Sequence, residues 1–352
     1  MKELQVTNRD AKQRLDKFLK RTFPEMGTSF LYKMLRKKNI TLNGKKATGS
    51  EQVLSGDLIQ CFFSDETFDK FAGIVSARSG DCALDDNNLG DKKRLAEKDF
   101  FFEYKKAYEE LKGISVIYED EHVLLLDKPA NILSQKAKPD DVSLNEWMIG
   151  YLLDCESVTE DSLRRFKPSV CNRLDRNTSG LVICGKTLLG SREMSRILKD
   201  RSLQKYYRTY VQGKMEGAET LIAYHKKNAK NNQAELRFAV SETEKRVYDE
   251  IVTAYRTIEA KDNYSYLEIE LITGKTHQIR AHLSAYGHPI VGDSKYGGKR
   301  KEGVCPKYQL LHAYRVVFPA LDGELAHLSN KEFVCEEPEA FKFFRKQYFP
   351  LT

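Results

Sequence analysis

One carboxylate stands between two guanidinium groups in the stretch NRLDRNTSG, which covers residues 172 to 180. Asp175 lies between Arg173 and Arg176, and a polar turn then leads into the apolar run LVIC. A carboxylate with cationic neighbours stays ionised and oriented, and at an exposed loop it can act as a nucleophile or general base. The alternative is a surface salt-bridge cluster without chemistry. We expect the turn residues, with Gly180, to form a tight bend that exposes Asp175.

Positive charge is concentrated at the start of the 352-residue chain. Residues 1–62 hold 13 Lys and Arg against 6 Asp and Glu, which accounts for the whole net charge of +7. A basic head on a neutral body favours a polyanionic partner. The alternative is a lysine-rich face that is simply solvated.

The basic segment is predicted to form a small module. Residues 13–23 and 30–39 carry apolar residues at helical spacing, with Thr28 or Ser29 as the N-cap of the second helix. A hairpin turning at Asn43–Gly44 and a short strand within 55–63 are expected to follow.

The elements QRLDKFL and LYKMLRKKNITLNGK, with the following SGD turn, resemble the S4 RNA-binding domain. This resemblance covers about residues 13–63. It implies an RNA-binding surface formed by Arg14, Lys33, Arg36, Lys37, Lys38 and Lys45.

Residues 64–112 are interpreted as an interdomain linker. The part SARSGDCALDDNNLGDKK is rich in Ser, Gly, Asp and Asn. A helix is predicted over 97–112, with Gly113 as its C-cap. The chain is therefore divided into an S4-like domain (1–63), a linker with a helix (64–112) and a second domain (113–352).

The second domain is predicted to have an α+β fold around a mixed, mostly antiparallel sheet, because strands and helices are mixed without regular alternation. We expect a strand hairpin over 114–129. Helices are predicted at 143–153 and 188–201, and strands at 205–213, 265–274 and 312–318. The polar segment 214–245 receives no assignment.

The stretch around Asp175 closely resembles the signature H-R-L-D-R-D-T-S-G-L of the RluA family of pseudouridine synthases. The resemblance implies that Asp175 is the catalytic residue. Asn172 and Asn177 stand where the family usually has a histidine and a second acid. Neither position is the catalytic carboxylate, so we expect activity to survive both changes.

Further segments resemble the family in the same order. VIYEDEHVLLLDKPANIL is similar to its opening strand pair, and KYYRTYVQG to its K-x-Y-x-A-x-V-x-G segment, whose active-site tyrosine falls on Tyr207. Without the resemblance, Tyr207 would be read as a core residue. The segment 272–298 is similar to T-G-R-x-H-Q-I-R-x-H-L, which implies a salt bridge from Arg280 to Asp175, with Lys275 where arginine is commoner. YQLLHAYRVVF is similar to the closing strand.

No metal and no cofactor are expected. His277 and His282 are five residues apart, so they do not share a helical face as zinc ligands do, and neither they nor His288 come with an acidic third ligand. The sequence also has no phosphate-binding glycine loop. Seven scattered cysteines without a C-x-x-C pair indicate reduced thiols and a cytoplasmic protein. Neither a membrane-spanning run nor a secretory signal is expected.

The resemblances imply an RNA pseudouridine synthase that isomerises uridines of 23S ribosomal RNA, because an S4-like head on this body is typical of the RluC-type branch. Arg173 and Arg176 would hold the loop and RNA phosphates. The alternatives are a tRNA enzyme of the same family, a non-catalytic S4-type RNA-binding protein, and a hydrolase using Ser179 with a histidine, which lacks a G-x-S-x-G elbow. We expect RNA to be the binding partner, and we expect the protein to be a monomer.

Overall fold

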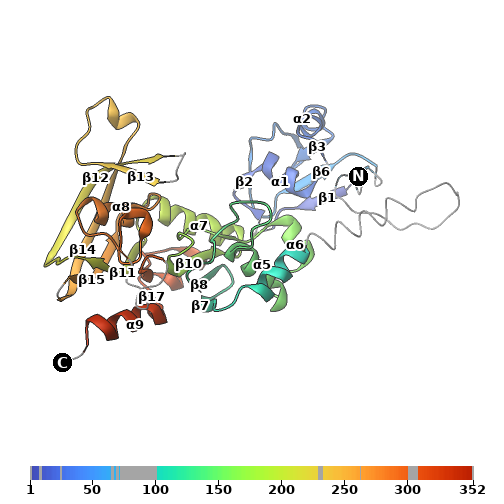
Figure 1. Ribbon diagram of the computed structural model, residues 1–352. Coiled ribbons are helices and arrows are strands. Elements are labelled where there is room, and N and C mark those ends of the chain that lie inside the picture. Colours follow the sequence, from blue (N-terminus) through green and yellow to red (C-terminus); the bar gives the residue numbers. More distant parts are fainter. Residues whose placement is uncertain are drawn as a thin grey trace. The chain divides into compact units, whose positions relative to one another are not determined.

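The chain divides into two compact units (Figure 1). The first unit comprises Met1–Glu103, Tyr151–Pro168 and Thr187–Leu189, and the second comprises Tyr104–Gly150, Ser169–Lys186 and Gly190–Thr352. The computed structural model describes residues 2–7, 10–23, 26–64, 67–68, 71, 101–228, 233–261, 263–299 and 308–350. The polar part of the predicted linker (76–93) and the first residues of its predicted helix (97–100) lie outside the described residues.

The first unit is a small α+β module with a hydrophobic core of its own. Its strands form a four-stranded sheet in the order β1-β6-β3-β4 and a separate pair, β2-β5. The elements are β1 (Lys2–Gln5), β2 (Gln13–Arg14), α1 (Leu15–Thr22), α2 (Thr28–Arg36), β3 (Ile40–Leu42), β4 (Lys45–Lys46), β5 (Gln52–Val53), β6 (Leu58–Cys61) and α6 (Glu160–Arg165).

The predicted amphipathic helices of this unit are present, and their apolar faces form the core. Leu15 and Leu19 of α1 and Leu31 and Leu35 of α2 are at most 1% exposed. The hairpin turns where it was expected, because Asn43 and the glycine after it both adopt positive φ, as a two-residue hairpin turn of this kind requires. The predicted N-cap of α2 is wrong.

Gly27 occupies that N-cap position, and Thr28 and Ser29 already belong to the helix. No side chain caps α2, since the residue at the N-cap position is a glycine and has no side chain to accept from the first amides of the helix.

The second unit is built on an 11-stranded sheet with the order β13-β12-β14-β15-β11-β16-β10-β8-β7, to which β17 and β9 add at the side. Only the β10–β16 pairing is parallel among the described strands. The predicted α+β class with a mostly antiparallel sheet is therefore confirmed.

The strands of this unit are β7 (Ser115–Glu119), β8 (Val123–Lys128), β9 (Ser169–Val170), β10 (Ser179–Gly185), β11 (Gln204–Gln212), β12 (Ala218–Asn228), β13 (Gln233–Arg237), β14 (Asp249–Lys261), β15 (Tyr264–Leu271), β16 (Leu311–Val317) and β17 (Glu332–Val334). The helices that lie wholly or mainly in it are α5 (Leu144–Asp154), α7 (Leu188–Lys199), α8 (Gln278–Ala285) and α9 (Glu339–Tyr348), with short 3-10 turns η2 (Glu244–Arg246), η3 (Ser294–Tyr296) and η4 (Gly323–Leu328).

The segment without an assignment, 214–245, contains a whole β-hairpin, β12 and β13 (Figure 1). An alternation of apolar and polar residues is hard to recognise in β13, because it is an edge strand whose residues are all half-buried or exposed. The hairpin is held in the sheet by the long pairing of β12 with β14.

The end of the predicted linker is part of the second unit instead of a tether. Residues 101–110 are helical, and Tyr104 is completely buried. Gly150 of α5 permits the close approach of this helix, since a Cβ there would lie 2.3 Å from the Tyr104 carbonyl oxygen. The rings of Tyr108 and Trp147 are 5.5 Å apart. The helix ends at residue 110, so the predicted C-cap at Gly113 is wrong.

None of the described helices is long and apolar enough to cross a membrane. Five cysteines lie within the described residues and all are free thiols; Cys61, Cys184 and Cys335 are buried, whereas Cys155 is exposed.

Candidate active site

A cleft of about 950 Å³ in the second unit is lined by all three residues predicted to be catalytic. Asp175 comes from the loop before β10, Tyr207 from the middle of β11 and Arg280 from the first turn of α8. Asp175 and Arg280, which are 105 positions apart in the sequence, are thus brought to one site by the sheet and by the packing of α8.

Arg280 forms the predicted ion pair with Asp175, with 2.8 Å between Nη1 and Oδ2. Its other edge donates twice to Asp293, from Nε at 2.7 Å and from Nη2 at 2.8 Å. Arg280 is 6% exposed and Asp293 is 2% exposed. Burial opposes the charge of Arg280, but Asp293 and Asp175 raise its pKa above the ordinary value. The guanidinium is therefore held by one carboxylate while it orients the other.

Asp293 is a site residue that the sequence interpretation missed. It lies in the segment GDSKYGG, directly before η3. A buried arginine needs a carboxylate partner that matches its planar group, so an acid near Arg280 in the sequence could have been suspected. Only the fold identifies which acid provides it.

Arg173 and Arg176 do not pair with Asp175. Both side chains are exposed, and within the described residues the ion-pair partners of Asp175 are Arg280 at 2.8 Å and His277 at 3.8 Å. The expectation that the flanking arginines orient the carboxylate is therefore wrong, because residues adjacent in sequence need not direct their side chains to the same point, and Arg173 and Arg176 face solvent.

Lys128 anchors the Asp175 loop through hydrogen bonds, and the sequence did not indicate this role. Its ammonium group, with 0% of the residue exposed, donates to the carbonyl oxygens of Pro129, Ile132 and Arg176 at 2.9 to 3.2 Å. Burial lowers the pKa of Lys128 to about 7, and the charges of Asp175 and Asp127 oppose the shift. Three carbonyl acceptors match the three hydrogens of an ammonium group.

The Asp175 loop is a tight turn, closed by the hydrogen bond from the Thr178 amide to the Asp175 carbonyl at 3.0 Å. Gly180 lies beyond this turn, within β10, and has φ of 113°. A Cβ there would lie 2.2 Å from the Ala313 carbonyl oxygen of β16. Gly180 thus permits close pairing of β10 with β16, and the bend itself forms earlier.

Asn172 anchors the other side of the loop to β10. Its Oδ1 accepts from the Ile183 amide at 2.7 Å, and its Nδ2 donates to the Leu181 carbonyl at 3.4 Å. Asparagine therefore performs a positioning role in the loop, and Asn177 lines the cleft as a half-buried residue.

Tyr207 is 7% exposed on the cleft side of β11, opposite an irregularity in its pairing with β16. Burial, with a smaller contribution from the charge of Asp175, raises the pKa of Tyr207 well above its ordinary value. Its hydroxyl is therefore neutral at physiological pH. The residue can present a flat ring and an O–H group to a planar ligand.

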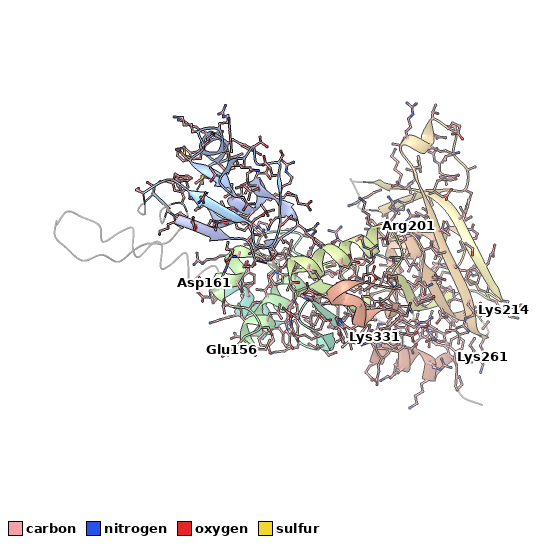
Figure 2. All side chains as sticks on the ribbon, turned by 180° about the vertical axis from the view of Figure 1, so that it is seen from behind. Glu156, Asp161, Arg201, Lys214, Lys261 and Lys331 are labelled. Atoms are coloured by element: carbon pink, nitrogen blue, oxygen red, sulfur yellow. The ribbon has the colours of Figure 1, made fainter. Side chains whose placement is uncertain are left out.

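The cleft is strongly basic. Ten Lys and Arg side chains line it against two carboxylates, Asp175 and Asp293. Lys205 and Lys227 reach it from β11 and β12, and Arg201, labelled in Figure 2, reaches it from just beyond α7. Lys275 also lines the cleft and pairs with Asp249 at 2.7 Å. Such a lining attracts a polyanion.

The basic residues predicted on the first unit lie on its surface. Lys33, Arg36, Lys37, Lys38 and Lys45 are exposed, and none of them forms an ion pair with a residue in the described ranges. Arg14 differs, because it pairs with Asp16 at 2.9 Å.

The three histidines of segment 272–298 have separate partners. The Nδ1 atom of His277 contacts the Tyr296 hydroxyl, that of His282 contacts the Thr253 hydroxyl, and that of His288 contacts the Gln212 carbonyl, each at 3.0 Å.

Ser179 does not line this cleft. It is 4% exposed, and its hydroxyl lies 2.9 Å from Nδ1 of His312. The other imidazole nitrogen contacts Cys335 at 3.4 Å, so the pair lacks the carboxylate of a hydrolase triad.

Residues 122–285 match the family described as RNA pseudouridylate synthase. Ribosomal large subunit pseudouridine synthase D of Borreliella burgdorferi is 31% identical over 244 residues, covering 67% of this chain and 69% of that protein. Ribosomal large subunit pseudouridine synthase C of Rickettsia felis is 29% identical over 313 residues, 88% of this chain and 89% of that protein. The human RNA pseudouridylate synthase domain-containing protein 4 shares the fold, with a TM-score of 0.54 and 18% identity over 70% of this chain and 97% of that one.

A carboxylate held by a buried arginine in a basic cleft, as Asp175 is, suits an enzyme that acts on RNA. The chain belongs to the RNA pseudouridine synthase family, as the resemblance in its sequence implied.

Proposed function

We propose that this protein converts specific uridines of 23S ribosomal RNA to pseudouridine, and that Asp175 starts the reaction. The observation that carries this proposal is the arrangement of Asp175. One of its oxygens, Oδ2, is bound by Arg280. Within the described residues Oδ1 has no hydrogen-bond partner, and the residue lines the cleft. A carboxylate held by one oxygen presents the other to a substrate.

The reaction is an isomerisation that needs no added group. The N1–C1′ bond of uridine breaks, a C5–C1′ bond forms, the proton on C5 leaves, and N1 takes up a proton. Asp175 supplies the ionised carboxylate at the sugar. The ring of Tyr207 packs on the uracil, with its hydroxyl near C5. Arg280 and Asp293 keep the carboxylate in place throughout, because both contacts of the guanidinium are made before substrate binds.

The substrate base has to leave its stack to reach Asp175, at a cost of about a few kcal/mol. The basic lining of the cleft offsets this cost through contacts with phosphates. Arg173 and Arg176 are exposed on either side of Asp175 and are suited to that role.

Two features support large-subunit ribosomal RNA as the substrate. Relatives that align with 88% and 67% of the chain are named ribosomal large subunit pseudouridine synthases. The first unit presents an exposed basic surface on α2 and the β3–β4 hairpin, which we propose to be an S4-type RNA-binding domain. We further propose that the protein acts as a monomer in the cytoplasm, where this RNA is made.

The test is pseudouridine mapping by carbodiimide labelling and primer extension on 23S rRNA and bulk tRNA. RNA from a strain lacking the gene is compared after rescue with the wild-type protein or with Asp175→Asn. We expect defined 23S stops to return with the wild type only, because the amide retains the shape of the carboxylate without its charge. Stops restored by Asp175→Asn would overturn the role of Asp175. A site lost from tRNA alone would overturn the substrate, and no change in either RNA would indicate a non-catalytic binding protein.

A further inference from the structure

The residue directly before α8 has an unusual backbone conformation beside the catalytic carboxylate. His277 has φ of 54° and ψ of 22°, the left-handed region that only a few per cent of residues other than glycine adopt. Conformations of this kind persist where the surrounding structure imposes them, and they cluster at functional sites. The His277 side chain is only 9% exposed, and the residue lines the cleft.

A hydrogen-bond relay determines which nitrogen of His277 carries its proton. The Tyr296 hydroxyl accepts from the Ala234 amide of β13 at 2.8 Å, and it lies 3.0 Å from Nδ1 of His277. Within the described residues, Nδ1 is the only acceptor that the hydroxyl proton contacts. Tyr296 therefore donates to Nδ1, and the neutral imidazole carries its hydrogen on Nε2.

That Nε2–H group lies near the catalytic carboxylate. Nε2 lies 3.8 Å from Oδ2 of Asp175, the oxygen that also accepts from Arg280. Burial lowers the pKa of His277, with Asp175 opposing the shift, which favours the neutral imidazole. A distance of 3.8 Å is beyond hydrogen-bonding range, but catalytic hydrogen bonds are often long before substrate binds and shorten in the complex.

We propose that His277 is a positioning residue that donates from Nε2 to Oδ2 of Asp175 when RNA is bound. This inference rests on the proposed function of Asp175. With donors from Arg280 and His277 on one oxygen, Oδ1 becomes the atom that meets the sugar. The relay begins in the β12–β13 hairpin, whose Lys227 lines the same cleft, so RNA seated against this hairpin acts on the carboxylate through Tyr296.

The test compares two substitutions with similar backbone strain. His277→Gln places an amide N–H near the position of Nε2, whereas His277→Leu fills the space without a donor. Single-turnover rates are measured as tritium release from a full-length 23S rRNA transcript labelled with [5-³H]uridine. We expect the rate at saturating enzyme to fall at least about 30-fold for Leu and less than about fivefold for Gln, with apparent RNA affinity changed less than about threefold in both.

Tyr296→Phe removes the group that sets the tautomer, and we expect an intermediate loss of about fivefold to 20-fold. His327→Leu is the matched control, since it removes a histidine–aspartate contact of 2.8 Å outside the cleft and should leave the rate unchanged. Thermal unfolding of each variant verifies that it is folded.

Equal losses for Gln and Leu would show that His277 acts through packing, and a wild-type rate for Leu would show no role; either result overturns the inference. Asp175→Asn in the same assay separates the two proposals. An inactive Asp175→Asn with an active His277→Leu refutes the inference alone, whereas an active Asp175→Asn refutes the proposed function.

Discussion

Basic side chains occur in two very different settings in this protein. On α2 of the first unit and at its C-cap, Lys33, Arg36 and Lys37 are exposed, and they form no ion pair with described residues. In the second unit, Arg280 is 6% exposed and bound by two carboxylates. Exposed cations increase the affinity for a polyanion, and salt weakens this affinity. A buried and fully paired arginine fixes the position of the carboxylates that it binds, and salt hardly changes this effect.

Among these basic side chains, we expect the largest effect from the replacement of Arg280. We expect Arg280→Met to lower the single-turnover rate at least about 10³-fold, because Asp175 loses its bound donor. The free energy of unfolding should fall by about 3–5 kcal/mol, because Asp293 is left buried and unpaired. Tritium release and urea unfolding measure the two effects.

Two further variants make this result specific. Arg280→Lys keeps the charge without the planar fork, and we expect a folded protein with a rate about 10²-fold lower. Arg196 also contacts two carboxylates, Glu193 and Asp200, but its side chain is 52% exposed. Arg196→Met should change the stability by less than about 1 kcal/mol and leave the rate unchanged. A folded Arg280→Met with near wild-type activity would contradict the assigned role.

The surface of α2 should show the opposite behaviour. Replacing Lys33, Arg36 and Lys37 together by glutamine should weaken binding of a 23S rRNA transcript about 10-fold to 100-fold. The slope of log K against log salt should fall by about 2 to 3, because three phosphate contacts are lost. The rate at saturating enzyme should not change. Filter binding between 50 and 200 mM salt measures the slope.

A charge-matched control is available on the second unit. Lys214, Lys261 and Lys331, labelled in Figure 2, do not line the cleft. Their joint replacement by glutamine removes the same charge and should leave the salt slope within about 0.5 of the wild-type value. Equal effects of the two triple variants would mean that net charge, and not the α2 surface, binds the RNA.

A further difference between the two units concerns acid. All seven histidines of the chain lie in the second unit, and burial lowers the pKa of His282 and of His312 to about 4. Their unfolded pKa is about 6.5, so the unfolded state binds more protons between these values. Stability is therefore fully present above about pH 6.5. As the pH falls towards 4, each histidine removes up to about 1.4 kcal/mol per pH unit.

The two units can be followed separately in this experiment. The single tryptophan, Trp147, lies in the second unit, so its fluorescence reports the unfolding of that unit, whereas far-ultraviolet circular dichroism reports both. We expect the urea midpoint by fluorescence to fall between pH 7 and pH 5 more than the midpoint of any remaining circular dichroism transition. His312→Asn should reduce this pH dependence. Parallel shifts of both signals would contradict the prediction.

Much of the fold could be predicted because its signals are local. The helices of the first unit follow from apolar residues at helical spacing, and the Asn43–Gly44 turn follows from the backbone freedom of those residues. The strands β8, β10 and β11 follow from short apolar runs with turn residues around them. The hairpin β12–β13 could not be predicted, because its edge strand gains its stability from pairing and not from an apolar face.

The candidate site likewise has residues that the sequence could identify and residues that only the fold could identify. Motif resemblance selected Asp175, Tyr207 and Arg280, all of which line one cleft. The resemblance could not show what holds them, because Asp293 and Lys128 act through contacts between segments far apart in the chain.

The sequence by itself determined the family, the α+β class and the three residues at the centre of the cleft, since each depends on residue types in a fixed local order. Only the tertiary structure decided that Arg280, and not the adjacent arginines, pairs with Asp175. Only the tertiary structure placed Tyr296, His277 and the β13 backbone in one relay towards that carboxylate. Ion pairs and relays depend on where side chains point after the sheet has closed, and neighbours in sequence are not neighbours there.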